Sequence, residues 1–576
     1  MTKKILATVL MLTMLLSCFV SASAVTEDGV VYFGYEGAYA GEAYAPVSDG
    51  DPVVVKIIHQ SDPNLTYFGN DTEEDNWYTK AIEKQLNIDI VYDQMIPSAN
   101  YYDTLSLLFA GQNYPDAMKV DGQMLKELAE AGLLKDMTEI YNVYASDYLK
   151  DVYSYTGVIF DGCTFDGKLC ALPRQESGNS GAAMVYIRQD WLEAVNLEAP
   201  TTLEELVNIA RAFKNNDPDG NGEDDTWGFG VQASFYREET GSGATSASLE
   251  SIFNALNAFP SSFHWNEDKT EVVYGGIEPE AKEALAYIAA LVEEGLVQRE
   301  FATMGWNEVN EAVYANKCGI VIAPWWQCVG YDMCTEGALW LCYAAPLNGE
   351  GQYINPMVNP AGEYVVVMKD ASDEVAEAVM KIVNLQAMTG YTCSFDILPE
   401  IKELYGESGM FNSNAMFPFV CNFDRYDKHS TFSGLLQKYY DGQITYDELP
   451  GEMLELVPKF DMLYSDAYKG DYKEYFTSDD FIPWVSNYLV FGDSCLNLYK
   501  ADEAGITVNV APVTFDINAS ESWVEYGASL KKLQSEYYTK IALGELSIDA
   551  FDEFANLWLS LGGADVISEL AEVANQ

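Results

Sequence analysis

Positive charge is scarce in this sequence. Its 576 residues include 32 lysines and arginines against 89 aspartates and glutamates, which gives a formal net charge of −57. A chain this acidic repels phosphate backbones and anionic lipid surfaces, so nucleic acid and charged membranes are excluded as general partners. The charge bears on solubility and association and carries no information about the fold.

Catalytic motifs are also lacking. The chain has three histidines, His59, His264 and His429, and no Walker loop, GxSxG, HExxH or CxxC motif. Carboxylates are so abundant that no glycosidase pair can be chosen from the sequence. We therefore expect a protein that is not an enzyme and that has no structural zinc site.

Long apolar runs are missing except at the N-terminus. Lys3 and Lys4 precede an apolar run over residues 5–16, which is typical of an export signal and too short to span a membrane. Two processing routes stay open. Residues 22–24, Ala-Ser-Ala, fit a signal-peptidase site, and the alternative is a lipoprotein box in which Cys18 is acylated. Both routes predict an extracellular protein, either secreted or lipid-anchored to the outer face of the cell membrane.

Cysteine pairing is not determined by the sequence. Of ten cysteines, nine remain beyond Cys18, and an odd number leaves at least one without an intramolecular partner. Cys163 and Cys170 are close enough in sequence for a disulfide, and two buried thiols are the alternative.

Strand and helix patterns alternate along the chain. Hydrophobic residues make up 48% and aromatic residues 13%, which excludes a disordered chain. Short apolar runs predict strands over residues 53–58, 88–92, 115–120, 183–187, 317–322 and 364–368. Amphipathic periodicity predicts helices over residues 77–86, 102–110, 281–294 and 374–385. Another helix is expected after Thr202, which with Glu205 forms a capping box. This alternation predicts α/β architecture with parallel sheets.

Six segments together carry a family resemblance. They are residues 111–116, 165–173, 186–192, 200–206, 217–222 and 322–326, beginning with Gly-Gln-Asn-Tyr-Pro-Asp and ending with Ile-Ala-Pro-Trp-Trp. In this order and spacing they resemble the extracellular solute-binding proteins of bacterial ABC importers. The likeness is to the large, lipoprotein-like members of family 1, in the branch that binds sugars and oligosaccharides. It covers roughly residues 53–390.

The resemblance implies an α/β fold of the two-lobed periplasmic-binding-protein type (type II), in which discontinuous lobes are joined by hinge strands. The expected organisation is a signal peptide at 1–24, a flexible leader at 25–50, the first part of lobe 1 at 51–172, the first part of lobe 2 at 173–345, the return of lobe 1 at 346–400, and a mainly helical part at 401–576 that completes both lobes. The lobes would hinge shut on a ligand. A monomer that delivers its ligand to ABC permease and ATPase subunits is implied.

An acidic loop at residues 217–228 matches the first nine positions of an EF-hand-type calcium loop. The predicted oxygen ligands are Asp217, Asp219, Asn221, Glu223 through its backbone, and Asp225. Gly222 occupies position six, where the chain turns sharply. Position twelve is Gly228 instead of a bidentate glutamate, so the match is incomplete. The expectation is a structural Ca²⁺ ion, and the alternative is a solvated acidic turn.

A sugar site needs flat aromatic platforms with carboxylates, amides and arginines at their edges. Trp325 follows a buried strand at the position where the resembling family places a sugar-stacking tryptophan. Trp77 opens a helix at the carboxyl edge of the predicted sheet. Core packing is the alternative for both. The remaining candidates for ligand binding are His59, Glu176, Arg188, Asp190, Trp326 and Tyr364. For Arg188 and Asp190, a surface or interdomain ion pair is the alternative.

These observations lead to one functional hypothesis and two alternatives. The hypothesis is a substrate-binding subunit of an ABC importer that reversibly binds an oligosaccharide or sugar derivative in a cleft between its lobes. A peptide- or polyamine-binding subunit is the alternative with the same fold. A secreted glycoside-active enzyme or carbohydrate adhesion module is the alternative from another class.

Overall fold

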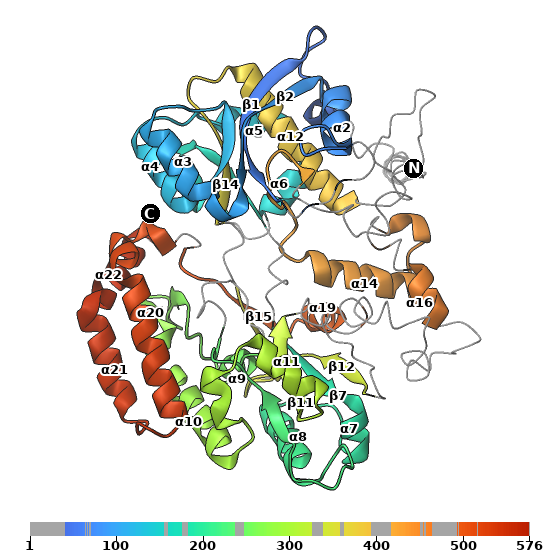
Figure 1. Ribbon diagram of the computed structural model, residues 1–576, viewed down its shortest axis with the longest axis vertical. Helices are drawn as coiled ribbons and strands as arrows, with labels where there is room; N and C mark the ends of the chain where they lie inside the picture. The colour runs from blue at the N-terminus through green and yellow to red at the C-terminus, as the bar shows by residue number, and fades with distance from the viewer. Residues whose placement is uncertain are drawn as a thin grey trace, which may run out of the picture.

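The chain forms two α/β lobes, drawn one above the other in Figure 1. The computed structural model describes residues 41–63, 65, 67, 71–154, 159–175, 183–236, 247–324, 338–357, 362–392, 416–449, 453, 457–463, 492, 495–514 and 517–574. In this part of the chain, every helix is too short or too polar to cross a bilayer. The α/β, two-lobed fold class expected from the sequence is confirmed.

The upper lobe, lobe 1, is built on a five-stranded sheet with the order β2-β1-β3-β14-β6. Its strands are β1 (Val53–Ser61), β2 (Ile88–Pro97), β3 (Ala117–Asp121), β6 (Ala171–Pro173) and β14 (Glu363–Val367). β1 lies between β2 and β3 and runs parallel to both, and β14 lies between β3 and β6 and runs antiparallel to both. A strand from a distant part of the sequence therefore lies inside this sheet.

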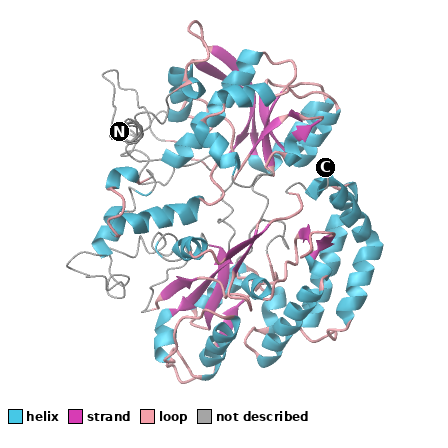
Figure 2. Ribbon diagram, turned by 180° about the vertical axis from the view of Figure 1, so that it is seen from behind, coloured by secondary structure: helices cyan, strands magenta, loops and turns pink. Residues whose placement is uncertain are grey.

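Helices cover both faces of the lobe 1 sheet (Figure 2). They are α2 (Trp77–Leu86), α3 (Tyr101–Ala110), α4 (Gly122–Glu130), α5 (Thr138–Tyr144), α6 (Asp147–Ser154) and α12 (Asp373–Thr392). The bounds of α2 are those predicted, because the Asn76 side chain caps its first turn and Asn87 ends it in the left-handed conformation, at φ 56°. Val55, Ile57 and Val120 are fully buried between sheet and helices.

The lower lobe, lobe 2, has a four-stranded sheet with the order β12-β7-β11-β8. Its strands are β7 (Ala183–Arg188), β8 (Trp227–Gly230), β11 (Cys318–Pro324) and β12 (Trp340–Tyr343). Alternate residues of β7 enter two different cores: Val185 and Ile187 enter one, and Met184 and Tyr186 the other. Both faces of this sheet are therefore buried, which explains why its strands are continuous apolar runs in the sequence.

The helices that pack on the first core of lobe 2 include α8 (Leu203–Asn215), α10 (Pro279–Glu294), α20 (Glu521–Ala542), α21 (Ala550–Trp558) and α22 (Ala564–Ala574). The predicted capping box is confirmed, since Thr202 and Glu205 satisfy each other's backbone amides at the start of α8. The second core includes residues of α11 (Trp306–Tyr314), α14 (Lys428–Tyr440), α16 (Val457–Leu463) and α19 (Cys495–Glu503). In Figure 1 α14 and α20–α22 stand on opposite sides of lobe 2.

Three chain segments lie side by side where the lobes meet. The first leaves lobe 1 after β6, the second enters it at β14, and the third precedes α14. Gln175 forms a parallel bridge with Phe423, and its amide donates a hydrogen bond of 3.0 Å to the carbonyl of Asn422. The amide of Arg174 donates a hydrogen bond of 2.8 Å to the carbonyl of Glu363. Among the residues that the structure describes, three crossings between the lobes are thus joined by hydrogen bonds.

β13 (Tyr353–Pro356) and β15 (Thr507–Val510) form a separate parallel pair, and Tyr353 contributes to the second core of lobe 2. At the entry to the first crossing, β4 (Thr164–Phe165) and β5 (Lys168–Leu169) form a hairpin whose turn has positive φ at Asp166 and Gly167. Cys163 and Cys170 flank this hairpin as thiols. Of the two states left open by the sequence, the structure has buried thiols at this pair.

Candidate functional site

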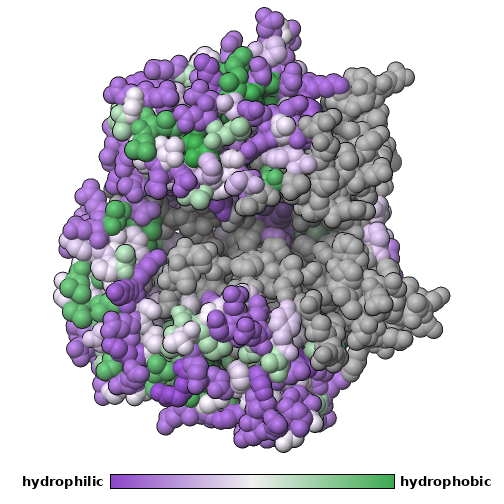
Figure 3. Space-filling view, viewed as in Figure 1, coloured by the Kyte–Doolittle hydropathy of each residue, from purple (hydrophilic) through white to green (hydrophobic). Residues whose placement is uncertain are grey.

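The edge of the lobe 1 sheet that faces lobe 2 carries a polar cluster, in which one buried lysine is surrounded by partly buried partners. β1 and β3 end at this edge, β14 begins there, and the first crossing leaves from it after Pro173. The carboxyl ends of parallel strands are the usual ligand-binding edge of an open α/β sheet. In the space-filling view of Figure 3, the surface is hollowed between the two lobes.

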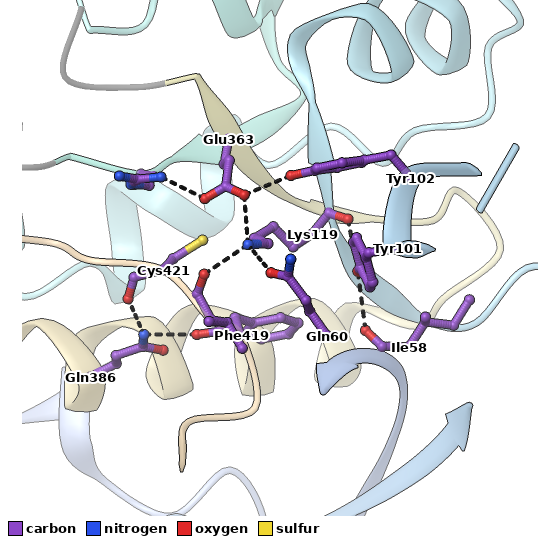
Figure 4. A network of polar contacts seen from close by, with 11 residues as sticks. Ile58, Gln60, Tyr101, Tyr102, Lys119, Glu363, Gln386, Phe419 and Cys421 are labelled. Carbon is purple, nitrogen blue, oxygen red and sulfur yellow. Dashed lines mark hydrogen bonds and ion pairs between the residues drawn. The ribbon is translucent and has the colours of Figure 1, made fainter. Parts of the chain in front are cut away.

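Lys119 is the centre of this cluster (Figure 4). Its buried ammonium group donates hydrogen bonds to Gln60 Oε1 at 2.5 Å, to Glu363 Oε1 at 2.6 Å and to the carbonyl of Val420 at 2.9 Å. These partners come from β1, β14 and the segment before α14, so one side chain of β3 joins three parts of the chain. A buried ammonium group needs such partners, because its desolvation is costly.

Glu363 is the shared acceptor. The Tyr102 hydroxyl donates to its Oε1 at 2.6 Å, and Arg174 Nη1 donates to its Oε2 at 2.7 Å. Burial pushes the pKa of Glu363 upward, but Lys119, Tyr102 and Arg174 together bring that pKa below its ordinary value. Burial and the Glu363 charge raise the pKa of Tyr102, which keeps its hydroxyl a donor. The edge is therefore an ordered set of one carboxylate, two cations, an amide and a phenol.

Reasoning from the sequence missed Lys119, Arg174, Tyr102 and Glu363. A signal was present for one of them, because Lys119 is a charged residue inside the apolar strand run Ala117–Val120. A lysine at a buried strand position requires a counter-charge nearby. The sequence could not name that counter-charge, since Glu363 lies 244 positions away.

His59 lies on β1 next to Gln60, whose side chain reaches Lys119, and it is almost fully buried. Its Nδ1 is 3.0 Å from the carbonyl of Pro418, and its Nε2 is 3.2 Å from Glu73 Oε1. Ser61 donates to the second oxygen of Glu73 at 2.8 Å. Burial raises the pKa of Glu73, but these hydrogen bonds lower it overall. His59 thus holds the segment that leads into α2, and its predicted contact with a ligand stays a prediction.

The other lobe 1 candidates are placed less completely. Tyr364 is buried on β14, where it pairs with Val120 and Pro173. Trp77 is the first residue of α2, and its side chain is outside the described structure. Glu176, Trp325 and Trp326 lie outside the described residues; Pro324, the residue before Trp325, ends β11.

Arg188 and Asp190 form a two-bonded ion pair within lobe 2. Arg188 Nε and Nη2 donate to the two Asp190 oxygens at 2.8 and 2.6 Å, and its Nη1 donates to Asn316 Oδ1 at 2.7 Å. The guanidinium also stacks 4.7 Å from the Trp191 ring centre. The chain arrives from lobe 1 at Ala183, the first residue of β7. Arg188 is the last residue of β7 and therefore lies at the other end of the strand. These contacts brace the far side of the sheet, and the predicted role in the cleft stays untested.

The acidic loop gathers its predicted calcium ligands around one amide. Asn221 Nδ2 donates to Asp219 Oδ2 at 2.9 Å and to Asp225 Oδ1 at 3.2 Å. The backbone amides of Asn221 and Gly222 donate to the Asp217 carboxylate at 3.1 and 3.0 Å. Burial and the neighbouring Asp217 and Asp225 raise the pKa of Asp219. Lys317 forms an ion pair with Asp225 and lowers the pKa of that carboxyl group.

The donor set of this loop fits a hard cation, since carboxylate and amide oxygens are what Ca²⁺ prefers. The oxygen atoms of these side chains are not arranged as a coordination sphere. In the described parts of the chain, no group of three or more His, Cys, Asp or Glu side chains is spaced to hold a metal ion. The carboxylates accept hydrogen bonds from the Asn221 side chain and from backbone amides of the loop, and Asp225 also pairs with Lys317.

Comparison with known proteins defines the class. The family model described as "Bacterial extracellular solute-binding protein" matches residues 69–386, more than half of the chain. The two-lobed fold and the polar edge between the lobes agree with this match. The chain belongs to the bacterial extracellular solute-binding protein family, as the sequence resemblance implied.

Three relatives place the chain within that family. It is 24% identical over 524 residues to the polygalacturonan/rhamnogalacturonan-binding protein YtcQ of Bacillus subtilis, covering 86% of this chain and 88% of YtcQ. It is 27% identical over 246 residues to the lipoprotein LipO of the same organism, covering 42% of this chain and 45% of LipO. It is 26% identical over 257 residues to the fructooligosaccharide ABC transporter substrate-binding protein FusA of Streptococcus pneumoniae, covering 42% of this chain and 45% of FusA.

A solved structure of FusA, an EF-hand mutant in complex with fructo-nystose, superimposes with a TM-score of 0.53 at 15% identity. It covers 91% of this chain and 99% of that chain. At this identity the superposition supports the fold. These relatives are described as a binding protein, a lipoprotein and a transporter subunit, and none of the three descriptions names an enzyme.

Proposed function

We propose that this protein is the substrate-binding subunit of an ABC importer and binds an oligosaccharide or sugar derivative reversibly between its lobes. Membership of the solute-binding family supports capture and delivery of a solute. Two of the three relatives described above are named for oligo- or polysaccharide ligands, which supports a carbohydrate. ABC permease and ATPase subunits are the proposed partners, and the protein is proposed to act as a monomer outside the cell, secreted or anchored through Cys18.

The observation that carries the proposal is the polar cluster at the lobe-facing edge of the lobe 1 sheet. Glu363 and Arg174 are partly exposed and are held there by each other and by the buried Lys119, so little conformational entropy is lost when they meet a ligand. Sugar hydroxyl groups both donate and accept hydrogen bonds, which matches an edge that offers both kinds of group. We propose Trp325 and Trp77 as stacking platforms, with Trp326, Glu176, Tyr364, His59, Arg188 and Asp190 as further candidates.

Binding is tested by calorimetric titration of the purified protein with galacturonan, rhamnogalacturonan and fructan oligosaccharides, and with peptides and polyamines for comparison. We expect saturable binding of one carbohydrate class. Small-angle scattering should show the lobes closing when that sugar is added. The recovered sugar should have an unchanged mass. Saturable binding of peptides or polyamines alone, or conversion of the sugar, would contradict the proposal.

We further propose that the acidic loop binds a structural Ca²⁺ ion. The close carboxylates of Asp217 and Asp219 support this, because like charges at short range favour a cation between them. Asp217, Asp219, Asn221 and Asp225 would hold the ion with the backbone carbonyl of Glu223. Bound calcium would supply the positive charge that keeps this loop compact beside β8.

A further inference from the structure

Lys317 links the acidic loop to the lobe 2 sheet. It is the residue before β11, and its carbonyl accepts a hydrogen bond of 2.8 Å from the amide of Trp227, the first residue of β8. Its ammonium group forms an ion pair with Asp225 Oδ2. The pairing of β8 with β11 therefore brings the positive charge of Lys317 next to Asp225, the residue at position nine of the calcium loop.

The other carboxylates of the loop accept hydrogen bonds from donors inside the loop. Asn221 turns its NH₂ group toward Asp219 and Asp225, and its Oδ1 accepts from the amide of Glu223 at 2.7 Å. An amide oxygen is the atom that a calcium ion would require at this position. Ion binding would therefore need the Asn221 side chain to turn away from Asp225 Oδ1, and the Lys317 ammonium group on Oδ2 would oppose a cation on the same carboxylate.

Position twelve of the loop, Gly228, cannot supply a further ligand for an ion. A Cβ atom added to Gly228 would lie 2.5 Å from the Cβ of Ala210 on α8, so no larger side chain fits there. With the bidentate ligand missing, the contribution of Asp225 becomes a larger share of any affinity.

We propose that Lys317 is the built-in counter-charge of this loop and competes with calcium for Asp225. The residue thereby sets how tightly the loop binds the ion. This inference rests on the proposed calcium site and assigns a role to a residue outside its ligand set. When calcium is scarce, the Lys317–Asp225 ion pair replaces the ion in part and stabilises the packing of the loop against β8 and β11.

The test compares the wild type with Lys317→Met, which keeps most of the length of the side chain and removes its charge. Calcium chloride is titrated calorimetrically into chelator-treated protein. We expect Lys317→Met to bind calcium about tenfold more tightly, because a competing ion pair and a repulsion between cations are both removed. In chelator alone, Lys317→Met should melt at a lower temperature than the wild type, and calcium should close or reverse that gap.

Lys282→Met is the control, since it removes a lysine of similar exposure that forms an ion pair with Asp552 elsewhere in lobe 2. Its calcium affinity should equal that of the wild type. If the wild type binds calcium and Lys317→Met binds it no more tightly, the competition is disproved while the calcium site stands. If neither protein takes up calcium, the calcium site and this inference both fall.

Discussion

Arg174 and Glu363 are 189 positions apart in sequence and are joined twice. The amide of Arg174 donates to the carbonyl of Glu363 at 2.8 Å, and its guanidinium donates to the Glu363 carboxylate at 2.7 Å. Arg174 begins the first crossing from lobe 1, and Glu363 stands where the chain re-enters that lobe. One carboxylate therefore links two crossings to the buried Lys119.

Removing the Glu363 charge should destabilise the protein strongly. In Glu363→Gln, Lys119 loses its counter-charge while it stays buried, which costs about 3 kcal/mol in the free energy of unfolding of lobe 1. Urea unfolding followed by tryptophan fluorescence measures this loss. The matched control is Glu294→Gln, which breaks an exposed pair with Arg211 and should cost less than about 1 kcal/mol. Equal losses in the two variants would contradict the role given to Glu363.

The same carboxylate predicts an acid dependence. The folded pKa of Glu363 is below the ordinary value of 4.5, so the unfolded chain takes up this proton first as the pH falls. The stability that Glu363 contributes is fully present above about pH 5 and is lost as the pH drops below 4.5 toward the folded pKa. The difference in unfolding free energy between wild type and Glu363→Gln should therefore be constant above pH 5 and shrink below pH 4. A constant difference down to pH 3 would disprove the assignment.

His429 predicts a second dependence at milder pH. Burial, with help from the charge of Lys428, lowers the pKa of His429 to about 3. Between that value and 6.5 the unfolded chain binds a proton that the folded chain does not, so this contribution to stability falls as the pH falls. The loss is about 1.4 kcal/mol per pH unit, or about 2 kcal/mol at pH 5 relative to pH 7. Chemical unfolding at both pH values should give a smaller loss in His429→Gln than in the wild type, and equal losses would refute the prediction.

Completing the calcium loop by Gly228→Glu should fail. Sequence logic favours this change, because glutamate is the usual residue at position twelve. In the structure the new side chain would collide with Ala210 on α8, and we expect a loss of about 3 kcal/mol or more. Calorimetric melts in calcium and in chelator measure it. Gly349→Glu is the control, because a Cβ at Gly349 meets nothing within 4 Å; a calcium-stabilised Gly228→Glu would overturn the prediction.

Calcium itself should stabilise the wild type. A ligand that binds only the folded state stabilises it by RT ln(1 + L/Kd), where L is the ligand concentration, so the melting temperature rises with that concentration. We expect the melt in millimolar calcium to lie several degrees above the melt in chelator, with no such gain in Asp217→Asn. Identical melts of the wild type in the two buffers would remove the proposed ion.

Local patterns predicted the elements well where local physics decides them. The helix over residues 77–86 has its predicted bounds because Asn76 and Asn87 supply both caps within the same short segment. The start of α8 was readable for the same reason, through Thr202 and Glu205. The bounds of β1 and β2 were predicted too short, since each continues beyond its apolar run to Ser61 and Pro97, where pairing in the sheet extends it.

The candidate site was predicted less well, because its partners are distant in sequence. Arg188 and Asp190 were recognised as a pair, yet only the antiparallel register of β7 shows that they lie at the end away from the lobe connection. The acidic loop was recognised as a donor set. Its neutralisation by Lys317 depends on the pairing of β8 with β11, which brings together residues 92 positions apart.

The sequence alone determined the acidic character of this protein, its α/β alternation, its family and the ordered oxygen donors of one loop. These features depend on composition, periodicity and short spacing, which a linear chain carries in full. Only the tertiary structure decided which charges meet. The burial of Lys119 against Glu363, the closeness of the three crossings and the hold of Lys317 on Asp225 all arise from strand order, because a sheet places next to each other residues that the sequence keeps far apart.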